Sequence, residues 1–102
     1  DAEQLNVEGM LVSQAQFVGE DDMNSGELSV RIRYRSRPIG CTIQKVKNLF
    51  ADVTTEELLL VRFKEKASAV TPGQSAVFYI GDRMVGGAYI CSQKGLQAYL
   101  QE

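Results

Sequence analysis

The chain has 102 residues, of which 44% are hydrophobic and 24% are charged, the composition of an ordinary globular protein with one modest core. Its formal net charge of -2 argues against a free-standing nucleic-acid-binding protein, and the absence of histidine excludes Cys/His zinc sites and histidine-based catalytic triads. No apolar run approaches the roughly 20 residues that cross a bilayer, and the first residues lack the pattern of a signal peptide. We therefore expect a cytoplasmic protein with no membrane partner and, since it lacks an initiator Met, a piece of a longer chain.

Short strands separated by turn-forming residues are expected along most of the chain. In chain order, the expected strands cover residues 10–18, 27–37, 41–46, 57–64, 75–80 and 83–90, with a polar loop over 19–26, a break at 38–40 and a loop or short helical turn over 47–55. Leu96, Tyr99 and Leu100 are spaced for a short C-terminal helix over 93–101. The pattern predicts an all-β fold, either a small antiparallel barrel or a sandwich, and a closed barrel is favoured because it leaves no free strand edges.

The hairpin over residues 69–90 is the best-defined segment. Pro72-Gly73 has the residue types of a type II turn, in which the second corner needs a positive φ. Gly81-Asp82 matches the two-residue turns of the primed kind that join antiparallel strands. Gly86-Gly87 marks a β-bulge or a close approach of two backbones.

Acidic and basic residues are segregated along the chain. Residues 1–30 contain seven acids and no base, whereas residues 31–51 contain six bases and no acid. A strand over 27–37 would carry four arginines on one face and three residues toward the core on the other, namely Arg31, Arg33, Arg35 and Arg37 against Val30, Ile32 and Tyr34. These arginines either pair with the acidic segment 20–27 and with Glu56 or Glu57, or form a face that follows RNA phosphates, and the two alternatives can coexist.

The expected strand over 57–64 is apolar on both faces. Leu58 and Leu60 are out of phase with the residues expected to face the core, which are Leu59, Val61 and Phe63. The outer face of such a strand is normally covered, here by the C-terminal tail, by a neighbouring domain or by a second chain. By the same alternation, Phe78 is expected in the core and Tyr79 on the outer surface.

The two cysteines, Cys41 and Cys91, have no CxxC spacing. They are expected to be buried thiols in a reducing compartment and not zinc ligands. Cys41 falls in an expected strand and should react slowly with thiol reagents. We find no catalytic or metal-ligating residue in the sequence.

Three stretches of the chain are distinctive in both order and spacing. They are RYRSRPIGCTI at 33–43, VRFKEKASAVTPGQSAVFYIGD at 61–82 and VGGAYI at 85–90, with a weaker LVSQAQFVG at 11–19. Together they resemble the C-terminal barrel of the bacterial tRNA-specific 2-thiouridylases, a family formerly labelled as tRNA methyltransferases. The resemblance implies a closed antiparallel barrel like the second domain of elongation factor Tu. On this basis we assign one domain over 1–102, with a lead-in over 1–26, a barrel core over 27–90 and a tail over 91–102 that the resemblance does not cover.

The resemblance also implies a function for a longer parent enzyme. Members of the family use ATP to activate the 2-oxygen of the wobble uridine of certain tRNAs and replace that oxygen with sulfur. Their adenylation loop and paired catalytic cysteines belong to an N-terminal domain and are absent from this sequence, so the fragment alone is expected to have no catalytic activity and no cofactor. The expected partners are tRNA, the N-terminal adenylating domain of the same parent chain and, for the parent, a sulfur-carrier protein.

In the family, an Arg-Tyr pair on the RYR strand and the Gln of the PGQ turn contact tRNA. In this sequence the matching residues are Arg33, Tyr34 and Gln74, with Arg35 as a weaker candidate. Arg33 and Tyr34 point to opposite faces of a regular strand, so their joint contact requires a position at the barrel mouth or a contact through the backbone. The alternative function is a structural or protein-interaction barrel that docks on a neighbouring domain or chain.

Overall fold

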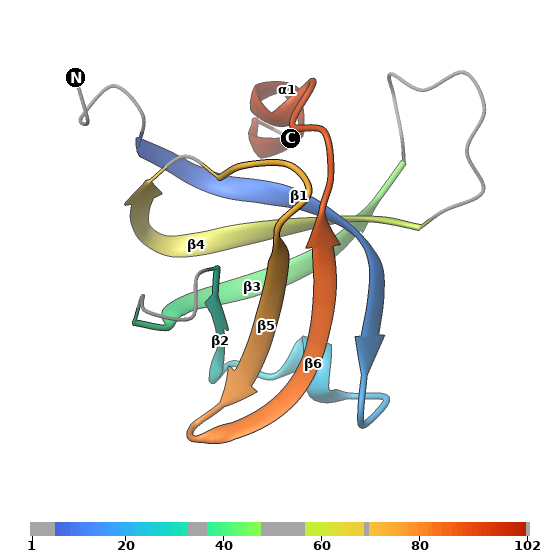
Figure 1. Cartoon of the computed structure of the whole chain (residues 1–102), viewed down its shortest axis with the longest axis vertical. Coiled ribbons are helices and arrows are strands. Elements are labelled where there is room, and N and C mark those ends of the chain that lie inside the picture. Colours follow the sequence, from blue (N-terminus) through green and yellow to red (C-terminus); the bar gives the residue numbers. More distant parts are fainter. Residues whose placement is uncertain (1–5, 33–36, 48–56, 69, 102) are drawn as a thin grey trace.

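Antiparallel strands close into a barrel in the computed structural model, which describes residues 6–32, 37–47, 57–68 and 70–101 (Figure 1). Within these ranges the elements are β1 (Asn6–Phe17), η2 (Asp22–Asn24, a 3₁₀ helix), β2 (Leu28–Arg31), β3 (Ile39–Val46), β4 (Leu58–Ser68), β5 (Ser75–Ile80), β6 (Arg83–Ile90) and α1 (Leu96–Leu100). The barrel closes in the order β1-β4-β3-β2-β5-β6. The predicted all-β barrel with a short C-terminal helix is confirmed, and no described helix is long and apolar enough to cross a membrane.

β1 belongs to the barrel, which corrects the prediction that residues 1–26 only lead into it. The strand starts at Asn6 and not at residue 10, and it pairs with β4 along one edge and β6 along the other. Gly9 occupies a buried position of this strand, where a Cβ atom would lie 2.6 Å from the carbonyl oxygen of Val61. The first part of β1 therefore has no apolar side chain at that buried position, and its hydrophobic pattern is too weak to reveal a strand.

The remaining strands differ from expectation mainly in length. β5 and β6 have the predicted bounds, as expected for strands limited by strong turn signals. β4 continues beyond residue 64 to Ser68, and α1 is confined to five residues within the predicted 93–101. The predicted loop over 47–55 lies outside the described residues except for Lys47.

Of the predicted strand over 27–37, residues 33–36 lie outside the described part of the chain and Glu27 and Arg37 lie outside a strand, whereas β2 ends at Arg31. The next residue lies in a bend. The last pair that joins β2 to β3 is Val30 with Ile39. Before Ile39 in the chain stands Pro38, which has no N–H to donate, so the ladder between the two strands cannot continue.

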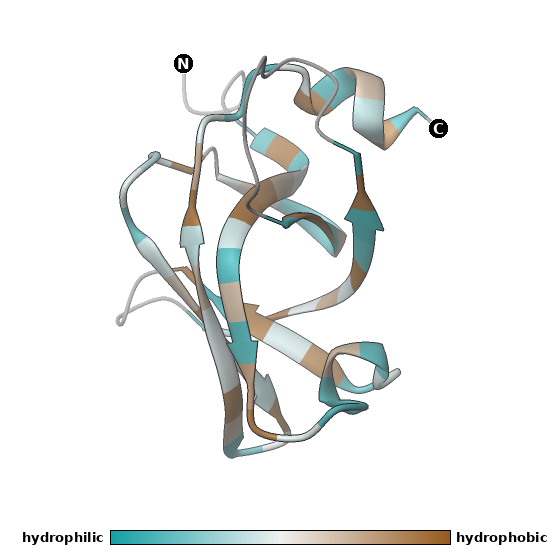
Figure 2. Cartoon of the chain, turned by 90° about the vertical axis from the view of Figure 1, so that its right-hand side faces the viewer, coloured by the Kyte–Doolittle hydropathy of each residue, from teal (hydrophilic) through white to brown (hydrophobic). Residues whose placement is uncertain are grey.

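Hydrophobic and hydrophilic residues alternate along much of the strands (Figure 2), and hydrophobic side chains fill the inside of the barrel. The buried members of this inner core are Met10, Val12, Leu28, Val30, Cys41, Leu59, Val61, Ala76, Phe78, Val85, Ala88 and Ile90. Phe63 and Phe17 pack against the core and are partly buried, and the Phe17 ring lies 5.2 Å from that of Phe78. The predicted alternation of β4 and β5 is therefore confirmed.

A second apolar cluster lies on the outside of β1 and β4 and accounts for the two apolar faces of β4. Leu11, Leu58 and Leu60 are buried there against Leu96 and Tyr99 of the C-terminal segment. The sequence left open whether the tail, a neighbouring domain or a second chain covers this face. In the described structure the chain's own tail covers it.

Polar contacts hold this tail in place. The guanidinium group of Arg62 donates hydrogen bonds to the carbonyl oxygens of Leu100, at 3.0 Å, and Tyr99, at 3.2 Å. The side-chain amide of Gln93 bonds to both backbone groups of Leu11, accepting from its N–H and donating to its carbonyl oxygen at 2.9 Å each. The tail is therefore part of the folded domain.

Glycines set the geometry of the 69–90 hairpin. Gly73 and Gly81 have φ values of 96° and 61°, which confirms the positive φ expected at the two turns. The ladder between β5 and β6 has a bulge beside Gly86. At Gly86 the backbones of β1 and β6 are so close that a Cβ atom would lie 2.6 Å from the carbonyl oxygen of Gln16.

Candidate nucleic-acid interface

Gln74 closes the turn that leads into β5, and hydrogen bonds fix the backbone of this turn. The N–H of Gln74 donates to the carbonyl oxygen of Thr71 at 3.3 Å, and its own carbonyl oxygen accepts from the N–H of Ile90 at 2.8 Å. The side chain is half-buried, and its Oε1 atom is buried without a hydrogen-bond donor among the described residues. Leaving a buried polar atom unsatisfied costs about 1–3 kcal/mol, so a ligand that donates to this oxygen would be favoured once the side chain turns to expose it.

Arg31, the last residue of β2, lies against an aromatic ring on the outer surface of the barrel. Its Cζ atom is 5.3 Å from the centre of the Tyr79 ring, within the range of a cation–π contact. Its Nε atom is buried and has no acceptor among the described residues. The contact confirms that Tyr79 lies outside the core and holds the guanidinium group in a defined position.

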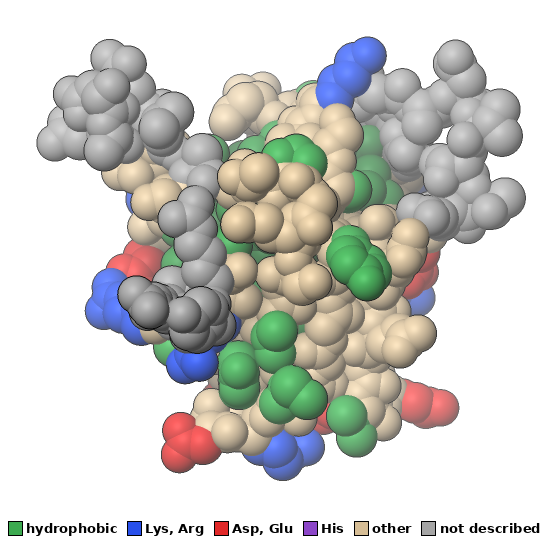
Figure 3. Space-filling view, in the orientation of Figure 1, with side chains coloured by type: hydrophobic (Ala, Val, Ile, Leu, Met, Phe, Trp, Pro, Cys, Tyr) green, Lys and Arg blue, Asp and Glu red, His purple; other side chains and the backbone are tan. Residues whose placement is uncertain are grey.

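Basic side chains gather at the left-hand edge of Figure 3, where β3 begins and β4 ends. Arg37 is paired with Glu65 at 3.2 Å, and Lys64 donates to the carbonyl oxygen of Gly26 at 2.9 Å. This partner of Arg37 is an acid of β4 that was not among the predicted partners, which were the acidic segment 20–27 and Glu56 or Glu57. The Arg37 side chain is 81% exposed, and an ion pair at such a site contributes at most about 1 kcal/mol.

Two described bases of the basic segment 31–47, Arg37 and Lys45, lie far apart along the direction of β3. Lys45 pairs with Glu57 at 3.3 Å near the far end of β3, roughly 20 Å by the rise of the strand from Ile39, where β3 begins just after Arg37. Arg37 also lies outside any strand, so the alternation that would align the four arginines does not reach it. Among the described residues, Arg37 and Lys45 therefore lie near opposite ends of β3.

Gln74 is the one predicted tRNA contact that falls among the described residues. Arg33, Tyr34 and Arg35 lie outside them, and so does the predicted core position of Tyr34. β2 runs toward the turn that carries Gln74, since its last residue pairs with Val77, three residues further along β5.

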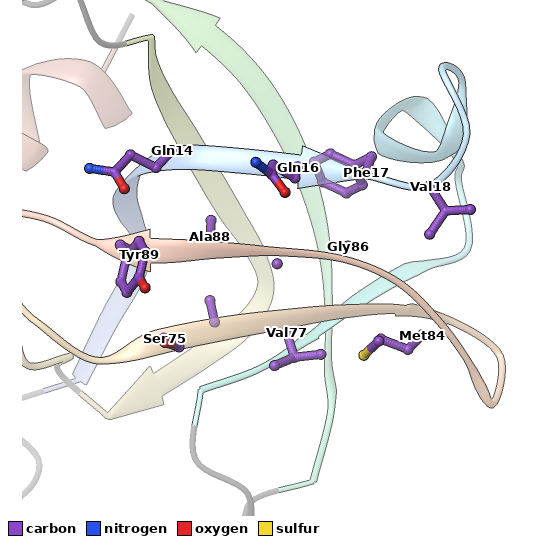
Figure 4. A pocket seen from close by; sticks show the side chains of 12 residues that line it. Gln14, Gln16, Phe17, Val18, Ser75, Val77, Met84, Gly86, Ala88 and Tyr89 are labelled. Atoms are coloured by element: carbon purple, nitrogen blue, oxygen red, sulfur yellow. The ribbon is translucent and has the colours of Figure 1, made fainter.

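A groove that the sequence did not predict crosses the outer side of β1, β6 and β5 (Figure 4). Its volume is about 620 Å³, and Gln14 and Gln16 of β1 line it together with Met84 and Tyr89 of β6. None of its twelve lining residues is charged. Simple alternation could not reveal the groove, because Met84 and Tyr89 are five residues apart in β6 and share the outer face only through the bulge between Met84 and Gly86.

Comparison with known proteins places this barrel in a family. Residues 7–90 match the family model of the aminomethyltransferase beta-barrel domain. The chain is 46% identical to a tRNA-specific 2-thiouridylase of Bacteroides fragilis, with 100% of the chain and 26% of that relative covered. The chain belongs to the family of C-terminal barrels of the tRNA-specific 2-thiouridylases.

Two other 2-thiouridylases support the assignment. The chain is 49% identical to the enzyme of Phocaeicola vulgatus, and the alignment covers 95% of the chain and 24% of that relative. It is 39% identical to the enzyme of Chlorobium chlorochromatii, and that alignment covers 79% of the chain and 21% of the relative. The chain thus spans about a quarter of the length of these curated relatives. The Bacteroides alignment covers the whole chain, so the tail after Cys91, which lies beyond the family model, also has a counterpart.

The described part of this 2-thiouridylase barrel does not fit ATP. Its α-helix has five residues, and no Gly-rich loop leads into it to cradle phosphates. The described residues also contain no group of three side chains that could hold a metal ion. We therefore derive no step through ATP from this domain.

Neither cysteine of the 2-thiouridylase barrel forms a disulfide. Cys41 is buried in β3, as predicted, and burial raises the pKa of its thiol to about 12. Cys91 is only half-buried, which corrects the prediction of two buried thiols. The residue follows directly after β6, where the chain leaves the barrel.

We expect iodoacetamide to modify Cys91 much faster than Cys41 in the folded protein. At pH 8 a thiol with a pKa of about 12 is ionised in about one molecule in ten thousand, and the thiolate is the reactive form. Peptide mapping after timed alkylation measures both sites, and a Cys91→Ser variant isolates Cys41. Rapid, stoichiometric modification of Cys41 without unfolding would contradict its burial and the register of β3.

Proposed function

We propose that this chain is the tRNA-contacting C-terminal barrel of a longer cytoplasmic enzyme that replaces the 2-oxygen of the wobble uridine of tRNA with sulfur. Membership in the 2-thiouridylase barrel family supports the reaction of the parent. In this proposal an N-terminal adenylating domain binds ATP and receives sulfur from a carrier protein. The barrel has no catalytic activity of its own and helps to position the tRNA.

The observation that carries the role of the barrel is the buried Oε1 atom of Gln74, which lacks a donor among the described residues. When the side chain turns outward, a 2′-hydroxyl or a base amino group of RNA would supply that donor. The turn is already fixed through Ile90, so binding would order little of the backbone. Gln74 can therefore recognise RNA through a neutral hydrogen bond, which does not depend on attraction between basic residues and phosphates.

Phosphate contacts would come from the basic residues at the same side of the domain. Arg37 is exposed and only weakly held by Glu65, so its guanidinium group can exchange the carboxylate for a phosphate. In the proposal Arg33 makes the principal charged contact, with Arg35 as a weaker one and Tyr34 beside them. The chain has a net charge of -2, and we expect the isolated barrel to bind tRNA weakly.

In the full-length protein we expect Arg33→Ala to weaken tRNA binding by about 1–3 kcal/mol, because a charge-assisted hydrogen bond is lost. The slope of log affinity against log salt concentration should fall by about one with the loss of one phosphate contact. Gln74→Ala should lower affinity or the thiolation rate and leave that slope nearly unchanged. Titrations of tRNA across a salt series, together with thiolation assays, measure both effects.

Arg83→Ala and Gln97→Ala are the matched controls. Both residues are exposed, and Arg83 lies at the opposite end of the β5–β6 hairpin from Gln74. The controls should bind and thiolate tRNA like the wild type. If Arg33→Ala and Gln74→Ala also match the wild type at every salt concentration, the barrel does not contact tRNA through these residues.

A further inference from the structure

The large exposed hydrophobic side chains of the described structure lie together in the groove on β1, β5 and β6. Val18, Met84 and Tyr89 are the large hydrophobic residues that stand out as exposed in the described structure, at 79%, 61% and 52%, and all three line this groove. Figure 3 shows hydrophobic side chains over β5 and β6, with acidic and basic side chains at the lower rim. Single exposed hydrophobic residues need no explanation, but their convergence on one groove indicates a binding surface.

The chemistry of the groove favours a protein segment over RNA. Its lining contains no lysine or arginine, whereas RNA binding depends on neutralising phosphates. Protein interfaces, in contrast, are depleted of charge at their centre and enriched in Tyr and Met, the types found here at Tyr89 and Met84. Gly87 lacks a side chain, and a Cβ atom there would contact only the carbonyl oxygen of Ala76, so this part of the floor is open to close approach by another chain.

The size of the groove favours a tethered partner over a second copy of this chain. Twelve residues line it, about half of the 20–30 that each side contributes to a stable complex of separate proteins. A segment of the same polypeptide needs far less affinity, because tethering supplies an effective concentration in the millimolar range. The matched relatives are about four times as long as this chain, so their polypeptides contain such a segment outside the barrel.

The C-terminal tail packs against a different part of the barrel. Leu96 and Tyr99 cover the outer face formed by Leu11, Leu58 and Leu60, and the Gln93 side chain is bonded to Leu11. The groove begins further along β1, at Gln14, and none of its lining residues comes from the tail. The domain thus covers one outer apolar face with its own C-terminal segment and leaves the second for another part of the protein.

We infer that the groove is the docking site for an uncharged, apolar segment that precedes the barrel in the same polypeptide. The inference rests on membership in a family of longer proteins and does not depend on the RNA contacts proposed above. Met84, Val18 and Tyr89 would provide the apolar contacts, and the amide of Gln16 would bond to the backbone of the segment.

Site-specific photo-crosslinking in the full-length protein, without tRNA, tests the inference. The crosslinker p-benzoylphenylalanine is placed at Met84 in one variant and at Gln44 in the control. Gln44 is an exposed residue of β3, which lies three strands from β6 in either direction around the barrel. After irradiation, mass spectrometry should find crosslinks within one chain from position 84 to residues before the barrel, and none from position 44.

A second pair of variants tests the apolar character of the contact. Met84→Glu and Gln44→Glu each add one carboxylate at an exposed position, with the crosslinker at Tyr89 in both. Met84→Glu should reduce the intramolecular crosslink roughly tenfold or more, since an unpaired carboxylate is costly to bury, and Gln44→Glu should leave it unchanged. Crosslinks only between copies, crosslinks only to tRNA when it is added, or no crosslink from position 84 would each overturn the inference.

Discussion

Replacing Tyr99 with Ala is expected to lower the free energy of unfolding by about 3–5 kcal/mol, as for other large aromatic residues removed from a packed site. Tyr99 is 2% exposed and fills the space between the tail and the three leucines on the outside of β1 and β4. Its loss leaves a cavity, or releases the tail and exposes Leu58 and Leu60 to water. Urea denaturation of the folded protein, followed by circular dichroism, measures the change.

Gln97→Ala is the control for this prediction. Gln97 belongs to the same helix but is exposed, so its replacement should change the stability by less than about 0.5 kcal/mol. A change equally small for Tyr99→Ala would show that docking of the tail contributes little to the stability of the barrel.

Gly86→Ala is expected to destabilise the domain by about 3 kcal/mol, the upper part of the range for overpacking. A Cβ atom at this position would lie 2.6 Å from the carbonyl oxygen of Gln16 and 2.6 Å from the ring of Phe17. The backbone of β1 cannot move away without disturbing its ladder with β6, and the Phe17 ring is packed against Phe78. Thermal or urea unfolding provides the measurement.

The adjacent glycine offers a close control. A Cβ atom at Gly87 would meet only the carbonyl oxygen of Ala76, at an ordinary contact distance of 3.5 Å. Gly87→Ala should therefore leave the stability nearly unchanged. Equal effects of the two substitutions would mean that the close approach of β1 and β6 is not specific to Gly86.

Part of the candidate interface could be predicted because local chemistry determines it. Pro72 and Gly73 define a turn by their own backbone preferences, and this turn places Gln74 at the start of β5. The unsatisfied state of the Gln74 Oε1 atom could not be predicted, since it depends on which groups surround the side chain after folding. The same holds for Arg37, whose partner Glu65 is distant in the sequence and is brought close by pairing of β3 with β4.

The sequence by itself determined the class of fold, the alternation of β4 and β5 and the hairpin. Alternation of polar and apolar residues has a period of two along a strand, and turn residues act through their own φ preferences, so both signals are local. Only the tertiary structure decided that β2 stops where Pro38 would face it, that Tyr99 covers the outside of β4, and that Val18, Met84 and Tyr89 meet in one groove. These features depend on which strands become neighbours when the barrel closes, and the pairing of strands distant in the sequence is not encoded in any single segment.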